Sequence, residues 1–364
     1  MICRLFVAVL IVPALAHAQF TVQASHTTAS LRGIANVDGQ VAWASGTAGT
    51  VLKTLDGGTH WVACATPAGA EKLDFRGIQA FDDKTALVMS SGKGDLSRVY
   101  KTSDGCVTWQ LLFTNPDAPD GFFDAMYFMR RDEGWLLGDP VKGNFYVGNT
   151  SDGGATWTRS KSPDLNEPTR NIGAFAASNQ SFTVSLTGPI FGGGAGYLYR
   201  GSWPGCSQSQ SYNQPELCLD RIPFDRLHLP LQAEGAAAGI FAVVATTEAV
   251  VAVGGDYTQP ANPAMTAAVS LDDGLTWHAA VTQPHGYRST VAYDVSTKTW
   301  ITAGPNGTDI SRDNGIHWTP LQPDNTKGDA SDADRDWNAI SLPFVVGPKG
   351  RIGKLRAESL KLTR

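Results

Sequence analysis

The sequence has little charge and no run of basic residues. Charged side chains make up 17% of its 364 residues, and 29 Lys and Arg stand against 34 Asp and Glu, which gives a net charge of −5. A protein that binds nucleic acid needs a basic patch or stripe to neutralise the phosphates. The composition therefore excludes nucleic acid as the expected partner.

Metal and cofactor motifs are also lacking. The 5 cysteines and 7 histidines are nowhere grouped at the spacing of a zinc site. The glycine-rich run from Gly192 to Gly196 does not complete a dinucleotide fingerprint and opens no helix. Patterns with the helical period are almost absent, which favours an all-β fold. We expect neither a bound metal nor a cofactor.

Only one stretch is strongly apolar, and it lies at the N-terminus. Residues 5–15 follow the basic Arg4, are too short to span a bilayer comfortably, and lead to the small residues of Ala16-His17-Ala18. This pattern is typical of a signal peptide over residues 1–18 that is cleaved before Gln19, and an uncleaved anchor is the alternative. We expect residues 19–364 to form one exported, monomeric domain, periplasmic or extracellular, with no transmembrane segment.

Four cysteines remain after the signal peptide is removed, and an even number in an exported chain favours disulfides. Cys206 and Cys218 lie in one loop-like stretch, so we expect them to pair and close a short loop. A bridge between Cys64 and Cys106 would join neighbouring repeats. The sequence leaves this second pairing open, because it does not fix the Cα separation that a disulfide requires.

One pattern, Ser/Thr-x-Asp-x-Gly-x-x-Trp, recurs at residues 54–61, 102–109, 150–157, 270–277 and 311–318, with Cys106 replacing the glycine in the second copy. This is the Asp box, or BNR repeat. Its carboxylate can accept backbone N–H groups within the turn, its glycine can adopt a positive φ, and its tryptophan can be buried between repeats. We therefore interpret the five aspartates as turn formers; they are Asp56, Asp104, Asp152, Asp272 and Asp313.

The spacing of the boxes predicts a β-propeller. The boxes at Thr54, Thr102 and Thr150 recur at an equal interval, within the range of about 40–50 residues that is typical of one four-stranded blade. The longer interval before Ser270 leaves room for a blade without a box and an insertion at about 203–236. The last blade lacks a strand, which residues 20–23 can supply to close the ring. We expect seven blades, with six as the alternative.

Charged residues are predicted to gather at one mouth of the ring. In an antiparallel blade, the start of the innermost strand and the end of the second strand lie on the same face of the ring. The Asp-box turns lie on the opposite face. Arginine recurs at the predicted start of the innermost strand, and aspartate replaces it once. The candidate site comprises these residues and those that end the second strands: Arg32, Arg76, Arg170, Arg288, Asp124, Asp139, Asp256 and Tyr257.

Two interpretations of the arginines stay open. Guanidinium groups bind carboxylates or phosphates through two parallel hydrogen bonds, so the arginines could form a pocket for an anionic ligand or an acidic peptide tail. Alternatively, each arginine is paired with an aspartate in a salt bridge that ties blades together.

The Asp boxes, the Arg-Gly-Ile strand starts and the blade number resemble the photosystem II stability/assembly factor-like propellers, within the wider sialidase and sortilin-like group. Several stretches are similar to non-photosynthetic bacterial members, which are often labelled oxidoreductases: 123–126, 138–140, 173–179, 254–257 and 286–289. No cofactor motif supports that label. The resemblance implies a binding factor that holds a partner's tail, with Arg32, Arg76, Arg170 and Arg288 in that role.

The residues expected at the mouth distinguish a glycosidase from a propeller that only binds a ligand. A sialidase-like glycosidase needs an arginine cluster, an acid, and a tyrosine nucleophile activated by glutamate. Tyr257 or Tyr287 could be that nucleophile, but Glu133 and Glu248 are expected on the Asp-box side. We therefore favour a non-catalytic propeller that binds a protein segment, a small anionic ligand or a glycan. A purely structural module within a larger assembly is a third possibility.

Overall fold

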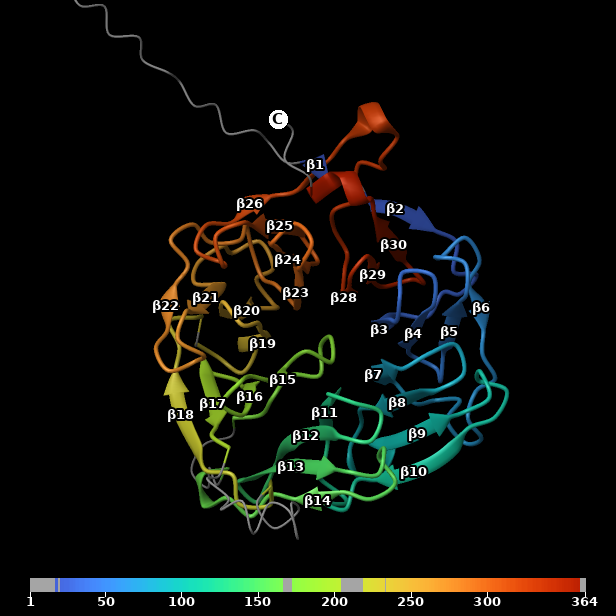
Figure 1. Cartoon of the computed structure of the whole chain (residues 1–364), viewed down its shortest axis with the longest axis vertical. Helices are drawn as coiled ribbons and strands as arrows, with labels where there is room; N and C mark the ends of the chain where they lie inside the picture. Colours follow the sequence, from blue (N-terminus) through green and yellow to red (C-terminus); the bar gives the residue numbers. More distant parts are fainter. Residues whose placement is uncertain (1–16, 19, 166–171, 204–218, 233, 361–364) are drawn as a thin grey trace, which may run out of the picture.

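The chain forms a ring of seven four-stranded antiparallel sheets, arranged as blades around a central axis (Figure 1). The computed structural model describes residues 17–18, 20–165, 172–203, 219–232 and 234–360. The predicted seven-bladed, all-β propeller is confirmed, and the six-bladed alternative is wrong. No helix within the described residues is both long and apolar enough to cross a membrane.

The first three blades are meanders whose strands follow one another outward from the axis. The strands are β3 (Leu31–Asn36), β4 (Ala42–Gly46), β5 (Val51–Thr54) and β6 (Val62–Ala63); β7 (Phe75–Ala80), β8 (Ala86–Ser90), β9 (Arg98–Thr102) and β10 (Gln110–Thr114); and β11 (Phe123–Phe128), β12 (Gly134–Val141), β13 (Asn144–Thr150) and β14 (Thr158–Arg159).

The next three blades repeat this order. They contain β15 (Phe182–Val184), β16 (Pro189–Gly192), β17 (Tyr197–Gly201) and β18 (Phe224–His228); β19 (Ala238–Ala245), β20 (Val250–Asp256), β21 (Ala267–Ser270) and β22 (His278–Ala279); and β23 (Thr290–Asp294), β24 (Thr299–Gly304), β25 (Gly307–Ser311) and β26 (Thr319–Pro320). Strand β18 lies inside the stretch 203–236 that we expected as an insertion, so part of that stretch completes the fourth blade. Cys206 and Cys218 lie outside the described residues.

The seventh blade joins the two ends of the chain. Its strands are β28 (Ala339–Ser341), β29 (Phe344–Val346), β30 (Ile352–Leu355) and the N-terminal β2 (Phe20–Gln23). Strand β2 pairs antiparallel with β30, from Phe20 opposite Leu355 to Gln23 opposite Ile352, as the sequence predicted. Beside it, β1 (His17–Ala18) pairs parallel with β27 (Gln322–Pro323). Residues 1–16, most of the predicted signal peptide, lie outside the described part of the chain.

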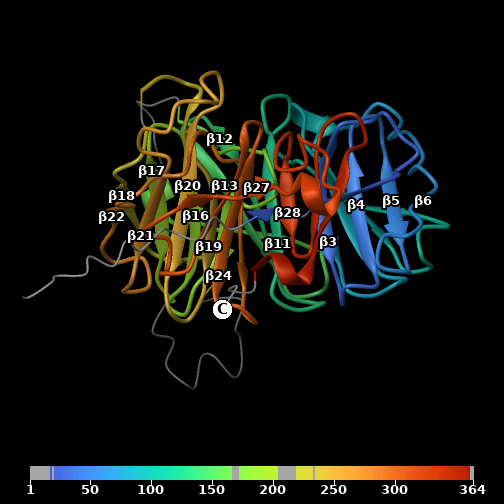
Figure 2. The ribbon, with the colours of Figure 1, turned by 90° about the horizontal axis from the view of Figure 1, so that it is seen from above.

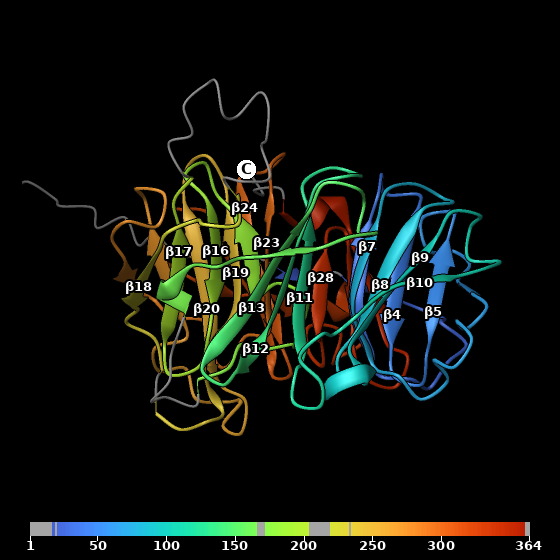
Figure 3. The same cartoon turned by 90° about the horizontal axis from the view of Figure 1, so that it is seen from below.

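Packing between neighbouring blades explains why the middle strands are almost continuously apolar. Seen edge-on, the strands run between the two faces of a thick disc (Figures 2 and 3). All residues of β4 and β8 are buried, because each face of these strands contacts an adjacent blade. Trp43 of the first blade and Phe75 and Val88 of the second belong to one such buried cluster.

The five repeated turns have the same hydrogen bonds. In each turn, the first Ser or Thr hydroxyl donates to the aspartate, and the backbone N–H four residues after the aspartate donates to the same carboxylate oxygen. The backbone N–H of His60 and its ring together hold the pKa of Asp56 at about 2. These carboxylates thus remain charged and are engaged within their own turns.

Cys106 occupies a position that elsewhere holds glycine. Its φ of 71° is in the left-handed region, like that of Gly58 in the first turn at 88°. Its N–H still donates to the hydroxyl of Thr102, so the turn keeps the shared geometry. Cys106 forms a disulfide with Cys64, with a Cα–Cα distance of 5.4 Å. The bridge covalently joins the first and second blades.

Replacing both cysteines should separate the effect of the bridge from that of the backbone conformation. We expect the Cys64→Ala/Cys106→Ala variant to lose about 2–4 kcal/mol of unfolding free energy, because the unfolded chain gains freedom. The Cys64→Ala/Cys106→Gly variant should regain about 1 kcal/mol, because glycine tolerates a positive φ. Urea unfolding measures both values. Equal stabilities for the two variants would contradict the positive φ at this position.

Candidate functional site

A repeated bulge directs side chains into one mouth of the ring. The innermost strands β3, β7, β11 and β19 each carry a break in register near one end, and the extra residues are Arg32, Arg76, Asp124 and Phe241. A bulge bends its strand and re-aims the side chain of the extra residue. These four side chains all line a single cavity of about 460 Å³. The equivalent position of four blades thus supplies its wall.

The segment that leads into β15 forms the floor of this cavity. It reaches the middle of the ring (Figure 1), where Ala174–Ala177 line the mouth cavity and Ser178–Gln180 line a second cavity of about 300 Å³. The Asn179 side chain accepts a hydrogen bond from Met126 N (2.7 Å) and donates one to Met126 O (2.9 Å). Gln180 donates to the carbonyl of Ile340, at a distance of 3.1 Å. The channel is therefore divided into two compartments.

Gly77 lies against the crossing segment. A Cβ atom at Gly77 would lie 2.8 Å from Oδ1 of Asn179, so the Asn179 side chain, which holds Met126, would have to shift. The Arg-Gly-Ile strand start thus has two roles: its arginine faces the mouth, and its glycine makes room for the crossing segment.

Two arginines at the mouth share one carboxylate. Arg76 Nε donates to Asp74 Oδ2 at 2.8 Å, and its Nη1 donates to the carbonyl of Ala176 at 3.2 Å. Arg32 Nε lies 3.9 Å from Asp74 Oδ1. Both atoms are buried, and neither makes a hydrogen bond among the described residues. Burial, followed by repulsion from Arg76, lowers the pKa of Arg32. The two arginines carry two positive charges, and the carboxylate of Asp74 balances only one of them.

A pair of carboxyl groups lies beside the arginines. Asp124 and Asp139 both line the cavity and interact electrostatically, and Asp139 Oδ1 accepts the N–H of Ala174 at 2.9 Å. Burial and then the neighbouring Asp139 raise the pKa of Asp124 well above its usual range, although Arg76 opposes this. Burial raises the pKa of Asp139 to about 6. Near neutral pH the pair thus holds one proton and one negative charge.

Aromatic side chains form another wall of the cavity. Phe175, from the floor segment, stacks on Phe241 with ring centroids 3.7 Å apart, and Tyr287 meets Phe241 edge-on at 4.7 Å. Tyr257 also lines the cavity and is 53% exposed. Burial raises the pKa of the Tyr287 hydroxyl, which makes it a poorer nucleophile. The cavity thus combines a charged side with an apolar one.

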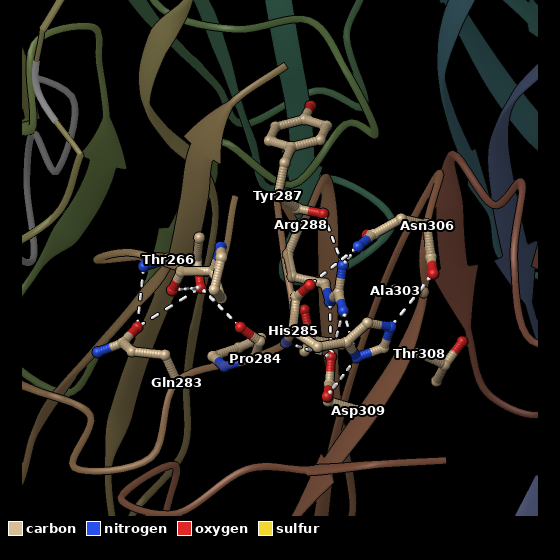
Figure 4. Close-up of polar contacts among 12 residues, drawn as sticks. Thr266, Gln283, Pro284, His285, Tyr287, Arg288, Ala303, Asn306, Thr308 and Asp309 are labelled. Atoms are coloured by element: carbon tan, nitrogen blue, oxygen red, sulfur yellow. Dashed lines mark hydrogen bonds and ion pairs between the residues drawn. The ribbon is translucent and has the colours of Figure 1, made fainter. Parts of the chain in front are cut away.

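Arg288 lies outside this cavity, in a buried ion pair. Its side chain is 0% exposed, and both Nε and Nη2 donate to Asp309 Oδ2. Nη1 donates to Asn306 Oδ1, and His285 Nδ1 contacts the other oxygen of Asp309. In Figure 4, the ring of Tyr287 extends away from this group. Arg288 is thus paired with an aspartate of its own blade rather than across blades, and its buried side chain is not available to a ligand.

Two further predicted site residues, Asp256 and Arg170, are not among the described residues that line the cavity. Asp256 accepts hydrogen bonds from the backbone and hydroxyl of Thr258 and from Gln259, which lower its pKa, and it does not line the cavity. The sequence placed Arg170 at the start of an innermost strand. The innermost strand of the fourth blade is β15, which begins at Phe182. Arg170 itself lies outside the described residues.

Three contributors were missed in the sequence. Phe241 stands at the bulge of β19, where the aligned blades carry Arg or Asp, so strand alignment could have found it. Asp74 directly precedes the Phe-Arg-Gly-Ile stretch, and its role depends on the proximity of two blades. Phe175 lies in the stretch 173–179, which carries part of the family resemblance but repeats nowhere in the chain, so no blade pattern assigned it to the mouth.

Comparisons with known proteins identify the fold. No protein-family model matches the chain, and no curated protein sequence matches it either. A solved structure described as YCF48 bound to D1 peptide is similar, with a TM-score of 0.61 at 14% identity, over 94% of this chain and 98% of that one. YCF48 from Cyanidioschyzon merolae gives a TM-score of 0.59 at 16% identity, over 94% and 100%.

A third similar structure is the extracellular domain of a putative one-component system, BT4673, from B. thetaiotaomicron. Its TM-score is 0.55 at 10% identity, and the match covers 94% of this chain but 40% of that one. At such identities the likeness establishes the fold alone. The chain thus has the seven-bladed fold of YCF48, the photosystem II assembly factor, in agreement with the resemblance found in its repeats.

Proposed function

We propose that this chain is an exported binding propeller, and that its mouth cavity holds an anionic segment of a partner protein. The observation that carries the proposal is the pair Arg32 and Arg76, which share the single carboxylate of Asp74. Arg32 Nε approaches Asp74 Oδ1 only to 3.9 Å and makes no hydrogen bond among the described residues, so the guanidinium gains a charge-assisted hydrogen bond when a carboxylate enters. A ligand anion would supply the missing partner.

Two further observations support binding to a protein segment. One similar structure is YCF48 with a bound D1 peptide, so a propeller of this fold can hold a peptide. The cavity also has an aromatic wall, formed in part by Phe175 and Tyr257, on which apolar side chains of a peptide can pack. The disulfide between Cys64 and Cys106 is consistent with export, since such bonds persist in oxidising compartments.

Glycoside cleavage is less well supported by the same residues. No glutamate is among the described residues that line the cavity, and the pKa of Tyr287 is raised rather than lowered. A sialidase-type mechanism needs the tyrosine to be activated by a neighbouring base. The proposal is therefore one of binding without catalysis.

Peptide binding can be tested by calorimetry. An acetylated, amidated peptide with two glutamates should bind, and its glutamine analogue should not. Arg32→Gln should weaken binding about tenfold, or ~1.4 kcal/mol, because it removes the positive charge that Asp74 does not balance. It should leave the fold intact, because Arg76 keeps its bond to Asp74.

A matched control is available on the opposite face. Arg130 and Arg131 lie in the exposed turn between β11 and β12, with side chains 65% and 59% exposed. The Arg130→Gln/Arg131→Gln variant removes more charge than Arg32→Gln and should bind the acidic peptide like the wild type. Equal binding of the glutamine peptide, or an unchanged affinity in Arg32→Gln, would refute the proposal.

Binding of the acidic peptide should strengthen at low pH. Above the Asp139 pKa of about 6, the carboxyl pair carries a negative charge that repels the ligand; below it, the pair is neutral. Glutamates with an ordinary pKa stay mostly ionised at about pH 5, so affinity should rise roughly threefold to tenfold from about pH 7.5 to about pH 5. Calorimetric titrations across this range measure the change.

The Asp139→Asn variant is the control for this pH dependence. Its amide oxygen can still accept the N–H of Ala174, while the charge is absent at every pH. The affinity of this variant should not change over the same range. A wild type that binds more weakly at the lower pH would show that the pair does not repel the ligand.

A further inference from the structure

The mouth cavity contains two incompletely paired groups of opposite charge. On one side, Arg32 has a buried Nε atom without a hydrogen bond among the described residues. On the other, Asp124 is 1% exposed, and its Oδ2 atom likewise has no hydrogen-bond partner there. Both residues line the same cavity of about 460 Å³. A purely acidic ligand would satisfy the first group and leave the second without a donor.

The two groups line the same cavity together with Arg76. Arg76 binds Asp74 beside Arg32, and its charge also lowers the pKa of Asp124. Asp124 Oδ2 can act only as an acceptor while the Asp124–Asp139 pair keeps its shared proton between the two carboxyl groups. A buried acceptor without a donor costs free energy, which a ligand N–H or ammonium group would recover.

We propose that the mouth recognises a mixed-charge peptide segment, in which a carboxylate binds Arg32 and Arg76 and a lysine ammonium binds the Asp124–Asp139 pair. This inference rests on the proposed function and specifies its ligand. In an extended peptide, residues two apart point to the same side, so a glutamate and a lysine separated by one residue reach neighbouring groups. Apolar residues on either side can pack against Phe175 and Tyr257.

The inference is tested with two peptides that differ only in the ammonium group. One carries Glu-Gly-Lys between glycine and phenylalanine, and the other has norleucine in place of lysine. By calorimetry at neutral pH, the lysine peptide should bind wild-type protein about tenfold more tightly, because a desolvated charge pair forms. The advantage should disappear in Asp124→Asn, which keeps the size of the side chain and lacks its charge.

The pH dependence of this advantage has a definite sign. Protonation of the pair below about pH 6 removes the negative charge, so the gain from lysine over norleucine should shrink at about pH 5. The norleucine peptide alone should bind more tightly there. The ammonium should also displace the shared proton from wild-type protein, and titrations in two buffers of different ionisation enthalpy detect that release without any variant.

The outcomes separate the two proposals. If both peptides bind equally to the wild type, or if the lysine advantage survives in Asp124→Asn, the mixed-charge inference is wrong while the anion site stands. If neither peptide binds, the anion site itself is wrong. Should Asp124→Asn fail to fold, the proton release by the wild type decides, and its absence on binding of the lysine peptide overturns the inference.

Discussion

The antiparallel pairing of β2 with β30 is the interaction on which the rest of the structure depends. Each blade of this chain buries its middle strands against its neighbours and has no independent core. A ring can bury every blade on both sides only if the last blade meets the first. The four residue pairs from Phe20–Leu355 to Gln23–Ile352 connect the two ends of the chain at that point.

Closure is also what creates the mouth cavity. Arg32 and Arg76 come from the first two blades, Asp124 from the third, and Phe241 from the fifth. They face one another only because their strands are arranged around a common axis. The segment 174–180 then turns the open channel into a blind cavity, because its side chains bind the backbones of the third and seventh blades. The site thus consists of repeated positions plus one segment that does not repeat.

This division explains what the sequence could predict. The blade number and the common position of Arg32, Arg76 and Asp124 follow from repeated patterns, which report local strand and turn geometry. The innermost strand of the fourth blade, which begins at Phe182, was not predicted from a repeat, because the described segment before it crosses the channel and has no counterpart in the other blades. Arg288 was equally hard to assign, because its partner Asp309 is brought to it by the pairing of later strands. The charge of an arginine is visible in the sequence, whereas its partner is set by the tertiary structure.

The central claim is that similar arginines of this ring have different roles, with Arg32 binding ligand and Arg288 supporting the fold. The most direct test measures both the thermal stability and the acidic-peptide affinity of Arg32→Gln and Arg288→Gln. Arg32→Gln should melt like the wild type and lose affinity, whereas Arg288→Gln should lose about 3–5 kcal/mol, because it leaves Asp309 buried without its charge partner. The folded fraction of that variant should still bind the peptide. Equal losses of stability in both variants, with peptide affinity unchanged in Arg32→Gln, would contradict the account.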